Sequence, residues 1–229
     1  MKLIIGNKVY SSWSLRPWIV MKAFAIPFEE TMVQLRERDT QERILAHSPS
    51  GKVPALIDDG VTVWDSLAIM EYLADKFPDR AIWPKDRIAR AHARCASAEM
   101  HSGFATLRNA CSMNVTRRFK ARDRGEAVAA DVARVTGIWR EAREKFGAKT
   151  GKPFLYGDFS AADGMYAPVV TRLHSYSIAV DSVSQAYMKA VLGHPAYKAW
   201  LAEAVAETWG LDNGEAAETL VEDLRARKA

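Results

Sequence analysis

The first 77 residues alternate short β-type and helical segments in an order that few folds accommodate. The pattern predicts β-α-β-α-β-β-α, in which the last two strands form a hairpin around an Asp-Asp-Gly turn. The first β-α-β unit should pair its strands in parallel, and the hairpin should be antiparallel. The predicted segments are residues 2–6, 14–26, 28–33, 40–47, 54–57, 61–64 and 66–76. We therefore expect a small mixed sheet with helices packed on it.

Everything after residue 86 is predicted to be helical. Residues 78–86 contain two prolines, which break a helix and indicate a linker. The predicted helices span about residues 87–113, 123–147, 160–178, 183–192 and 195–208. The sequence therefore predicts an α/β domain over 1–77, a linker over 78–86 and an all-helical domain over 87–229.

Two helix starts in the second half carry local signals. Ser160 and Asp163 have the spacing of a capping box, with Asp in place of the usual Glu. Pro195 follows His194 and suits the first position of a helix. The polar tail over 212–229 is expected to be a final helix or a frayed end.

The composition fits a folded, soluble chain. Its 229 residues are 48% hydrophobic and 26% charged, which suffices for a packed core. No apolar run approaches the ~20 residues of a membrane span, and the first residues are too short in apolar character for a signal peptide. Cys95 and Cys111 form no CxxC pattern, so we expect two small buried residues, no disulfide and no metal site. The predicted compartment is a reducing cytoplasm.

The positive charge is concentrated in the middle of the chain. The formal net charge is +4, yet residues 85–149 carry fifteen basic and seven acidic side chains. The run over 117–124, RRFKARDR, is its densest part. Clustered Arg and Lys are typical of phosphate contacts, but no nucleic-acid-binding module accompanies them. We therefore favour a solvated helix end or connection and expect no nucleic-acid partner.

The order of elements suggests a thioredoxin-like first domain, in which an active group lies where the first strand meets the first helix. In redox thioredoxins that place holds a CxxC motif. Here it holds Ser11 and Ser12, so disulfide exchange by the chain's own thiols is excluded. A hydroxyl at a helix N-terminus can donate a hydrogen bond to a docked anion. Ser14 is the alternative cap of the same helix.

Three stretches resemble the cytosolic glutathione transferases, and the resemblance extends over essentially the whole chain. Residues 11–16, SSWSLR, are similar to the SSCSxR stretch of the zeta class. Residues 48–56, SPSGKVPAL, resemble the family's NPxxxVPxL pattern, and 63–73, VWDSLAIMEYL, resemble its [EQ]SxAIxxYL pattern. Their order and spacing make the combination specific.

The resemblance implies a glutathione site built from Lys52, Val53, Pro54, Asp65 and Ser66. The Val53-Pro54 bond would be cis, which lets the Val53 backbone pair with the cysteinyl backbone of glutathione. Ser66 and the start of its helix would hold the γ-glutamyl carboxylate, and Asp65 the ammonium group. The structural alternatives are a trans proline opening an edge strand and a Ser66 that only caps its helix.

The catalytic hydroxyl implied by the resemblance belongs to Ser11 or Ser12, and alignment favours Ser11. It would stabilise the glutathione thiolate by a hydrogen bond, because a free thiol with a pKa of ~8.5 is mostly protonated at neutral pH. Tyr10 is a rival, since some classes use tyrosine, but it stands one position early. Arg16 either faces the anionic site or is a surface residue of the first turn.

Departures from the zeta class limit how far its function transfers. Trp13 stands where that class has the cysteine that takes part in isomerisation, and residues 99–109 differ from its fourth helix. A maleylacetoacetate isomerase role is therefore not supported. In the family the inner end of that helix faces the glutathione site, so the resemblance implies a second-substrate pocket, unless these residues are plain core: Trp13, Met100, Phe104, Arg108 and Met113. His101 and His174 lack partner ligands and are interpreted as structural or surface residues.

These observations predict a glutathione transferase with glutathione as cosubstrate. Its thiolate would attack a small hydrophobic electrophile, and the chain would form a homodimer, as the family does. The same thiolate would also serve a glutathione-dependent isomerase or peroxidase. A non-catalytic binding or partner protein on the same fold is the alternative from another class, since function depends on the site and not on the fold.

Overall fold

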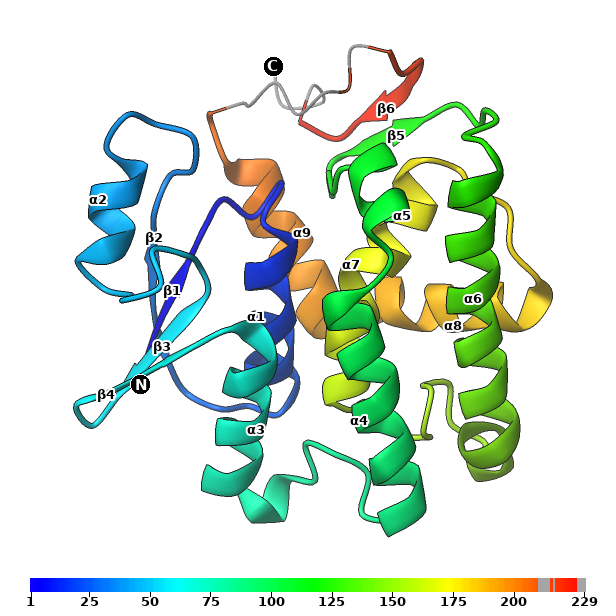
Figure 1. The fold of residues 1–229 in the computed structure, drawn as a ribbon, viewed down its shortest axis with the longest axis horizontal. Helices are drawn as coiled ribbons and strands as arrows, with labels where there is room; N and C mark the ends of the chain where they lie inside the picture. Colours follow the sequence, from blue (N-terminus) through cyan, green and yellow to red (C-terminus); the bar gives the residue numbers. More distant parts are fainter. Residues whose placement is uncertain (210–214, 216, 226–229) are drawn as a thin grey trace.

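The computed structural model describes residues 1–209, 215 and 217–225, and its first part is a four-stranded sheet with helices packed against it (Figure 1). The strand order is β2-β1-β3-β4. β1 (Lys2–Ile5) runs parallel to β2 (Glu29–Met32) and antiparallel to β3 (Ala55–Asp58), which pairs with β4 (Val61–Trp64). The predicted mixed sheet and its hairpin are confirmed.

The helices of this part are α1 (Ser12–Ala23), α2 (Thr40–Leu45) and α3 (Ser66–Lys76). α1 begins two residues earlier than predicted, because its N-cap is Ser11 and not Ser14. α1 packs closely on α7 (Ala161–Ser175) at Gly164, where an added Cβ would lie 2.5 Å from a methyl of Val20. This close approach fixes α1, which carries the candidate catalytic serines, against the helical part.

The second part of the chain is mainly helical and lies beside the sheet in Figure 1. Together with α7, its helices are α4 (Arg87–Ser102), α5 (Ala105–Ala110), α6 (Glu126–Ala142), α8 (Ser182–Gly193) and α9 (Pro195–Ala206). Short turns are the 3-10 helices Pro78–Arg80 and Ala148–Thr150 and the π-helix Arg143–Gly147. The predicted helix over 87–113 is broken after Gly103, because Phe104 adopts a left-handed backbone with φ of 58°.

The predicted capping box at the start of α7 is present. The Asp163 carboxylate accepts hydrogen bonds from the Ser160 backbone N–H at 2.8 Å and from the Ser160 hydroxyl at 2.9 Å. Burial raises the pKa of Asp163 to about 6. The predicted start of α9 at Pro195, capped by His194, is also confirmed.

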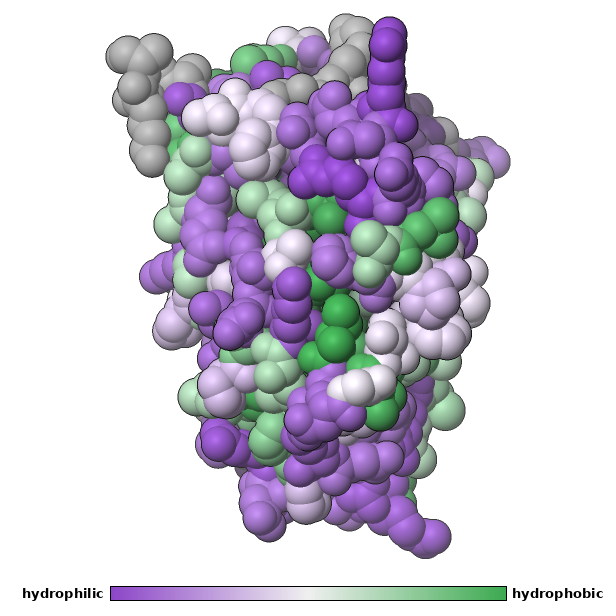
Figure 2. Space-filling model, turned by 90° about the vertical axis from the view of Figure 1, so that its left-hand side faces the viewer, coloured by the Kyte–Doolittle hydropathy of each residue, from purple (hydrophilic) through white to green (hydrophobic). Residues whose placement is uncertain are grey.

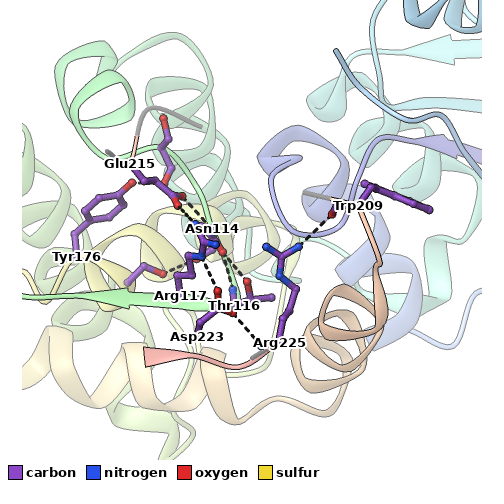
Figure 3. Close-up of polar contacts among 10 residues, drawn as sticks. Asn114, Thr116, Arg117, Tyr176, Trp209, Glu215, Asp223 and Arg225 are labelled. Carbon is purple, nitrogen blue, oxygen red and sulfur yellow. Dashed lines mark hydrogen bonds and ion pairs between the residues drawn. The ribbon is translucent and has the colours of Figure 1, made fainter. Parts of the chain in front are cut away.

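A second, two-stranded sheet was not predicted. β5 (Arg117–Phe119) pairs antiparallel with β6 (Leu220–Asp223), so part of the tail, expected to be a final helix or a frayed end, is a strand. Arg117 bonds the carboxylates of Glu215 and Asp223 (Figure 3). The remaining tail positions of that prediction, 212–214, 216 and 226–229, lie outside the described residues. The domain limits at 77 and 87 stay predictions.

Acidic residues of the tail also form ion pairs with arginines of the basic run over 117–124. Glu218 bonds both Arg122 and Arg124, and the pKa of Glu218 is lowered to about 2 chiefly by its hydrogen bond with Arg124. Arg124 is 4% exposed. Arg117, Arg122 and Arg124 of the run therefore all form ion pairs with acidic residues of the tail.

Candidate functional site

A cavity of about 790 Å³ brings the three sequence motifs together. It lies where the start of α1, the loop before β3, the start of α3 and the end of α4 meet. Its walls are Trp13, Leu35, Ile44, Ser50, Gly51, Lys52, Val53, Pro54, Trp64, Asp65, Ser66 and His101. Every residue predicted to bind glutathione is therefore at this cavity. Figure 2 views the molecule from the α2 side, where hydrophilic residues surround a narrow strip of hydrophobic ones.

The loop before β3 supplies one wall. The Val53-Pro54 peptide bond is cis, as the resemblance implied. Gly51 has a φ of 63°, a conformation that favours glycine, and an added Cβ would lie 2.2 Å from the Gln41 amide. Lys52 is exposed at the rim. The loop therefore presents the Val53 backbone and a positive charge to the same space.

The start of α3 supplies the opposite wall. Asp65, with a φ of 77°, is the N-cap, and its carboxylate accepts a hydrogen bond from the Leu67 N–H at 2.8 Å. The helix is thus capped by Asp65 and not by Ser66, contrary to the structural alternative. Ser66 is 1% exposed, and its Oγ accepts a hydrogen bond from Arg16 at 3.4 Å.

The two candidate catalytic serines differ in their surroundings. The Ser11 hydroxyl donates to Ser14 Oγ at 2.7 Å, and Ser14 Oγ also accepts from the Gly6 N–H at 3.0 Å. Ser11 and Ser12 are 6% and 9% exposed, and neither is among the residues that line the cavity. Trp13, the next residue, does line it. The first turn of α1 contains no acidic residue, so its partial positive charge is not offset by the helix itself.

A group of cations lies behind Trp13. Arg16 is 2% exposed, so it is not the surface residue of the alternative interpretation, and its guanidinium carbon is 4.1 Å from the Trp13 ring centre. The guanidinium carbon of Arg108 is 5.3 Å from the same ring. Burial, followed by repulsion from Arg108 and Arg172, lowers the pKa of Arg16 to about 9. Among the described residues, no carboxylate forms an ion pair with any of these three arginines.

The predicted second-substrate residues divide into two groups. Trp13 lines the cavity, whereas Arg108 does not line it and lies against the Trp13 ring. Met100, Phe104 and Met113 are 1%, 8% and 2% exposed and belong to the main hydrophobic core. They do not line the cavity. A second substrate in the cavity would therefore contact Trp13 before it reached any of these three residues.

His101 is a site residue that the sequence interpretation set aside. It lines the cavity, its Nε2 is 3.2 Å from Asp65 Oδ2, and its ring meets Trp13 edge-on at 5.2 Å. Its Nδ1 is buried and has no hydrogen-bond partner within the described residues. The sequence analysis did not predict the break between α4 and α5, which lies three residues after His101. No signal in the sequence indicates the direction of the His101 side chain.

The cysteines follow the prediction only in part. Cys111 is buried, and its burial raises the pKa of the thiol, whereas Cys95 is exposed and the expectation of its burial was wrong. Within the described part of the chain, histidine, cysteine and acidic residues form no group of three suited to a metal ion. None of the described helices has the length and apolar character needed to cross a bilayer.

The sequence and the structure of the chain are similar to those of known proteins. Residues 10–76 match the model described as "Glutathione S-transferase, N-terminal domain", and they include α1, the cis-proline loop and the start of α3. The chain is 27% identical to the maleylacetoacetate isomerase of Pseudomonas aeruginosa over 205 residues, 86% of this chain and 94% of that protein. Residues 10–76 are therefore similar to the N-terminal domain of glutathione S-transferases, and the similarity to a relative of this family extends over most of the chain.

Two further comparisons show how far the similarity extends. The chain is 38% identical to a probable maleylacetoacetate isomerase of Caenorhabditis elegans over 105 residues, 44% of this chain and about half (49%) of that protein. A sphingomonad glutathione S-transferase, solved with glutathione, superposes with a TM-score of 0.61 at 25% identity. The superposition covers 89% of this chain and 98% of the sphingomonad chain. The glutathione S-transferase fold therefore extends through the helical part, and the predicted thioredoxin-like and helical architecture is confirmed.

Proposed function

We propose that the chain binds glutathione in the 790 Å³ cavity and uses its thiolate on a small electrophile. The observation that carries this is the convergence of the cis-proline loop, Asp65 and Ser66 on one cavity beside the start of α1. Val53 offers a backbone edge to the cysteinyl unit, and Ser66 offers a hydroxyl to the γ-glutamyl carboxylate. The sphingomonad relative, solved with glutathione, supports the ligand.

The thiolate would be stabilised at the start of α1. A hydroxyl hydrogen bond and the unopposed helix N-terminus both favour the ionised sulfur. Ser11 must release Ser14 to donate to that sulfur, whereas Ser12 stands one position further into the helix. Experiments must therefore distinguish the role of Ser11 from that of Ser12.

The electrophile would meet Trp13 and Arg108 on the side of the cavity toward α4. The three apolar members of the predicted pocket are buried in the main hydrophobic core. The cations behind Trp13 would attract an electrophile that carries a negative charge. The homodimer implied by the family stays part of the proposal, and analytical ultracentrifugation measures it.

A second candidate is glutathione-dependent isomerisation, because relatives carry the name maleylacetoacetate isomerase. Trp13 in place of the zeta-class cysteine argues against the same mechanism. Both functions require bound, ionised glutathione.

Calorimetric titration with glutathione tests the proposal, with wild type beside Ser66→Ala. We expect wild type to bind and Ser66→Ala to bind at least tenfold more weakly, because the carboxylate loses a hydrogen bond. No binding by wild type at millimolar glutathione would contradict the proposal and favour a non-catalytic partner protein. Conjugation and isomerisation are then separated by product analysis with each class of electrophile.

A further inference from the structure

The segment that leads into the candidate serines is held by residues more than a hundred positions away in the sequence. Lys8 and Val9 lie between β1 and α1 and are 3% and 0% exposed. Buried backbone N–H and C=O groups need hydrogen-bond partners. The partners of this segment therefore decide its conformation.

All four backbone polar groups of Lys8 and Val9 have such partners. The Glu207 carboxylate, just beyond α9, accepts the Lys8 N–H at 2.5 Å and the Val9 N–H at 3.3 Å through separate oxygens. Trp200 of α9 donates its indole N–H to the Lys8 carbonyl at 2.8 Å. The Val115 N–H donates to the Val9 carbonyl at 3.2 Å. Every one of these partners belongs to the helical part or to the segment that follows α9.

The serines follow directly from this segment. The Ser11 N–H donates to the Asn7 carbonyl at 2.8 Å, and the Ser12 N–H to the Tyr10 carbonyl at 2.9 Å. The turn that presents both hydroxyls thus begins on the residue before Lys8. A shift of Lys8 and Val9 would move the turn and, with it, the hydroxyl that meets the sulfur.

We propose that Glu207 is a positioning residue, whose carboxylate fixes the Lys8–Val9 segment and thereby the place of Ser11 and Ser12 at the glutathione sulfur. This rests on the proposed function. Its physical basis is the carboxylate itself, since one acceptor with two oxygens satisfies two consecutive N–H groups. A carboxamide in its place offers one oxygen and turns an NH₂ group toward the other N–H.

Glu203 provides a matched control. It lies on the preceding turn of α9 and forms an ion pair with the Lys8 ammonium group, but it accepts no backbone N–H of the segment. Its side chain is 48% exposed. Glu203→Gln therefore removes a carboxylate beside Lys8 and leaves the backbone contacts in place.

The test compares Glu207→Gln with Glu203→Gln by the pH dependence of thiolate absorbance in bound glutathione. We expect Glu207→Gln to raise the apparent pKa of the bound thiol by at least half a unit, with glutathione affinity within threefold of wild type. Glu203→Gln should leave that pKa unchanged. Equal thiol pKa values in wild type and Glu207→Gln, or equal shifts in the two variants, would overturn the positioning role.

Amide hydrogen exchange of residues 7–15 reports the same effect without glutathione. Glu207→Gln should speed exchange there at least threefold, and Glu203→Gln should not. If wild type fails to bind glutathione while this contrast persists, the proposed function is refuted and the ordering of the serine turn by Glu207 stands. If Glu207→Gln does not fold, Trp200→Phe keeps an aromatic ring, removes the donor to the Lys8 carbonyl together with the five-membered ring of the indole, and is expected to give the same contrast. Unchanged exchange in Trp200→Phe would then count against the role.

Discussion

The Nε2 atom of His101 lies 3.2 Å from Oδ2 of Asp65, so α4 and the start of α3 meet across the wall of the candidate glutathione cavity. Asp65 already caps α3 through its other oxygen. Both oxygens of this carboxylate are therefore oriented before a ligand enters. Such preorganisation lowers the conformational cost of binding.

Removing the His101 ring should weaken glutathione binding. In His101→Ala, the Asp65 carboxylate loses one of its two contacts and points less consistently at the ligand ammonium group. We expect the Kd for glutathione to rise three- to tenfold in a calorimetric titration. His174→Ala is the control, because His174 lies on α7 beside a separate surface cavity and should leave the Kd unchanged. Equal affinities in wild type and His101→Ala would show that the Asp65–His101 contact does not serve the ligand.

Arg16→Met separates binding from stability. The desolvation cost of this buried cation opposes its stacking on Trp13 and its hydrogen bond to Ser66, so its removal should change the free energy of unfolding by less than about 1 kcal/mol. The same variant removes the cation that touches Ser66, and the Kd for glutathione should rise about tenfold. Urea denaturation and calorimetry measure the two quantities. Arg134→Met, which breaks an exposed ion pair with Glu99, should alter neither. A large loss of stability in Arg16→Met with unchanged affinity would assign Arg16 to the core alone.

Ser14 accepts the hydrogen bonds that hold Ser11 and the end of β1 together. Its Oγ is the acceptor for the Gly6 N–H and for the Ser11 hydroxyl, and the residue is fully buried. Ser14→Ala leaves that N–H without a partner, and we expect a loss of about 1–3 kcal/mol in the free energy of unfolding. Ser102→Ala removes an exposed hydroxyl bond within α4 and should change stability by less than about 0.5 kcal/mol. Matching losses in the two variants would contradict the role given to Ser14.

The ion pairs of the tail should make stability depend on pH. The hydrogen bond with Arg124 is the main cause that holds the pKa of Glu218 at about 2, below its ordinary value of 4.5. Because the folded-state pKa is the lower one, the stabilisation is complete above about pH 4.5 and is lost as the pH falls toward 2. Denaturation at pH 6 and pH 3 should show Glu218→Gln well below wild type at the higher pH and closer to it at the lower. A constant difference at both pH values would mean that the carboxylate charge is not what holds the tail.

Local signals predicted most of the fold. The Asp-Asp-Gly hairpin, the Ser160–Asp163 capping box and the start at Pro195 each depend on neighbours within a few residues, and all three are present. The pairing of β5 with β6 could not be predicted in this way. It joins residues about a hundred positions apart, and neither strand is long or apolar enough to signal itself.

The sequence predicted most of the residues that could bind glutathione, but not how their side chains are arranged. The motifs predicted the five glutathione-binding residues, and all of them line the cavity, whereas Ser11 and Ser12 of the first motif do not. The direction of His101 depends on how α4 packs against α3, and the burial of Arg16 depends on how α7 packs on α1. These are tertiary contacts between separate elements, which no local pattern in the sequence reports.

The most direct test of the account is the ultraviolet thiolate absorbance of bound glutathione across pH, in wild type, Ser11→Ala and Ser12→Ala. The account predicts that wild type ionises the thiol at least one pH unit below its solution pKa of ~8.5. One of the two serine variants should still bind glutathione and lose that shift. If wild type binds glutathione with an unshifted thiol pKa, or if both variants keep the shift, a serine at the start of α1 does not support the thiolate.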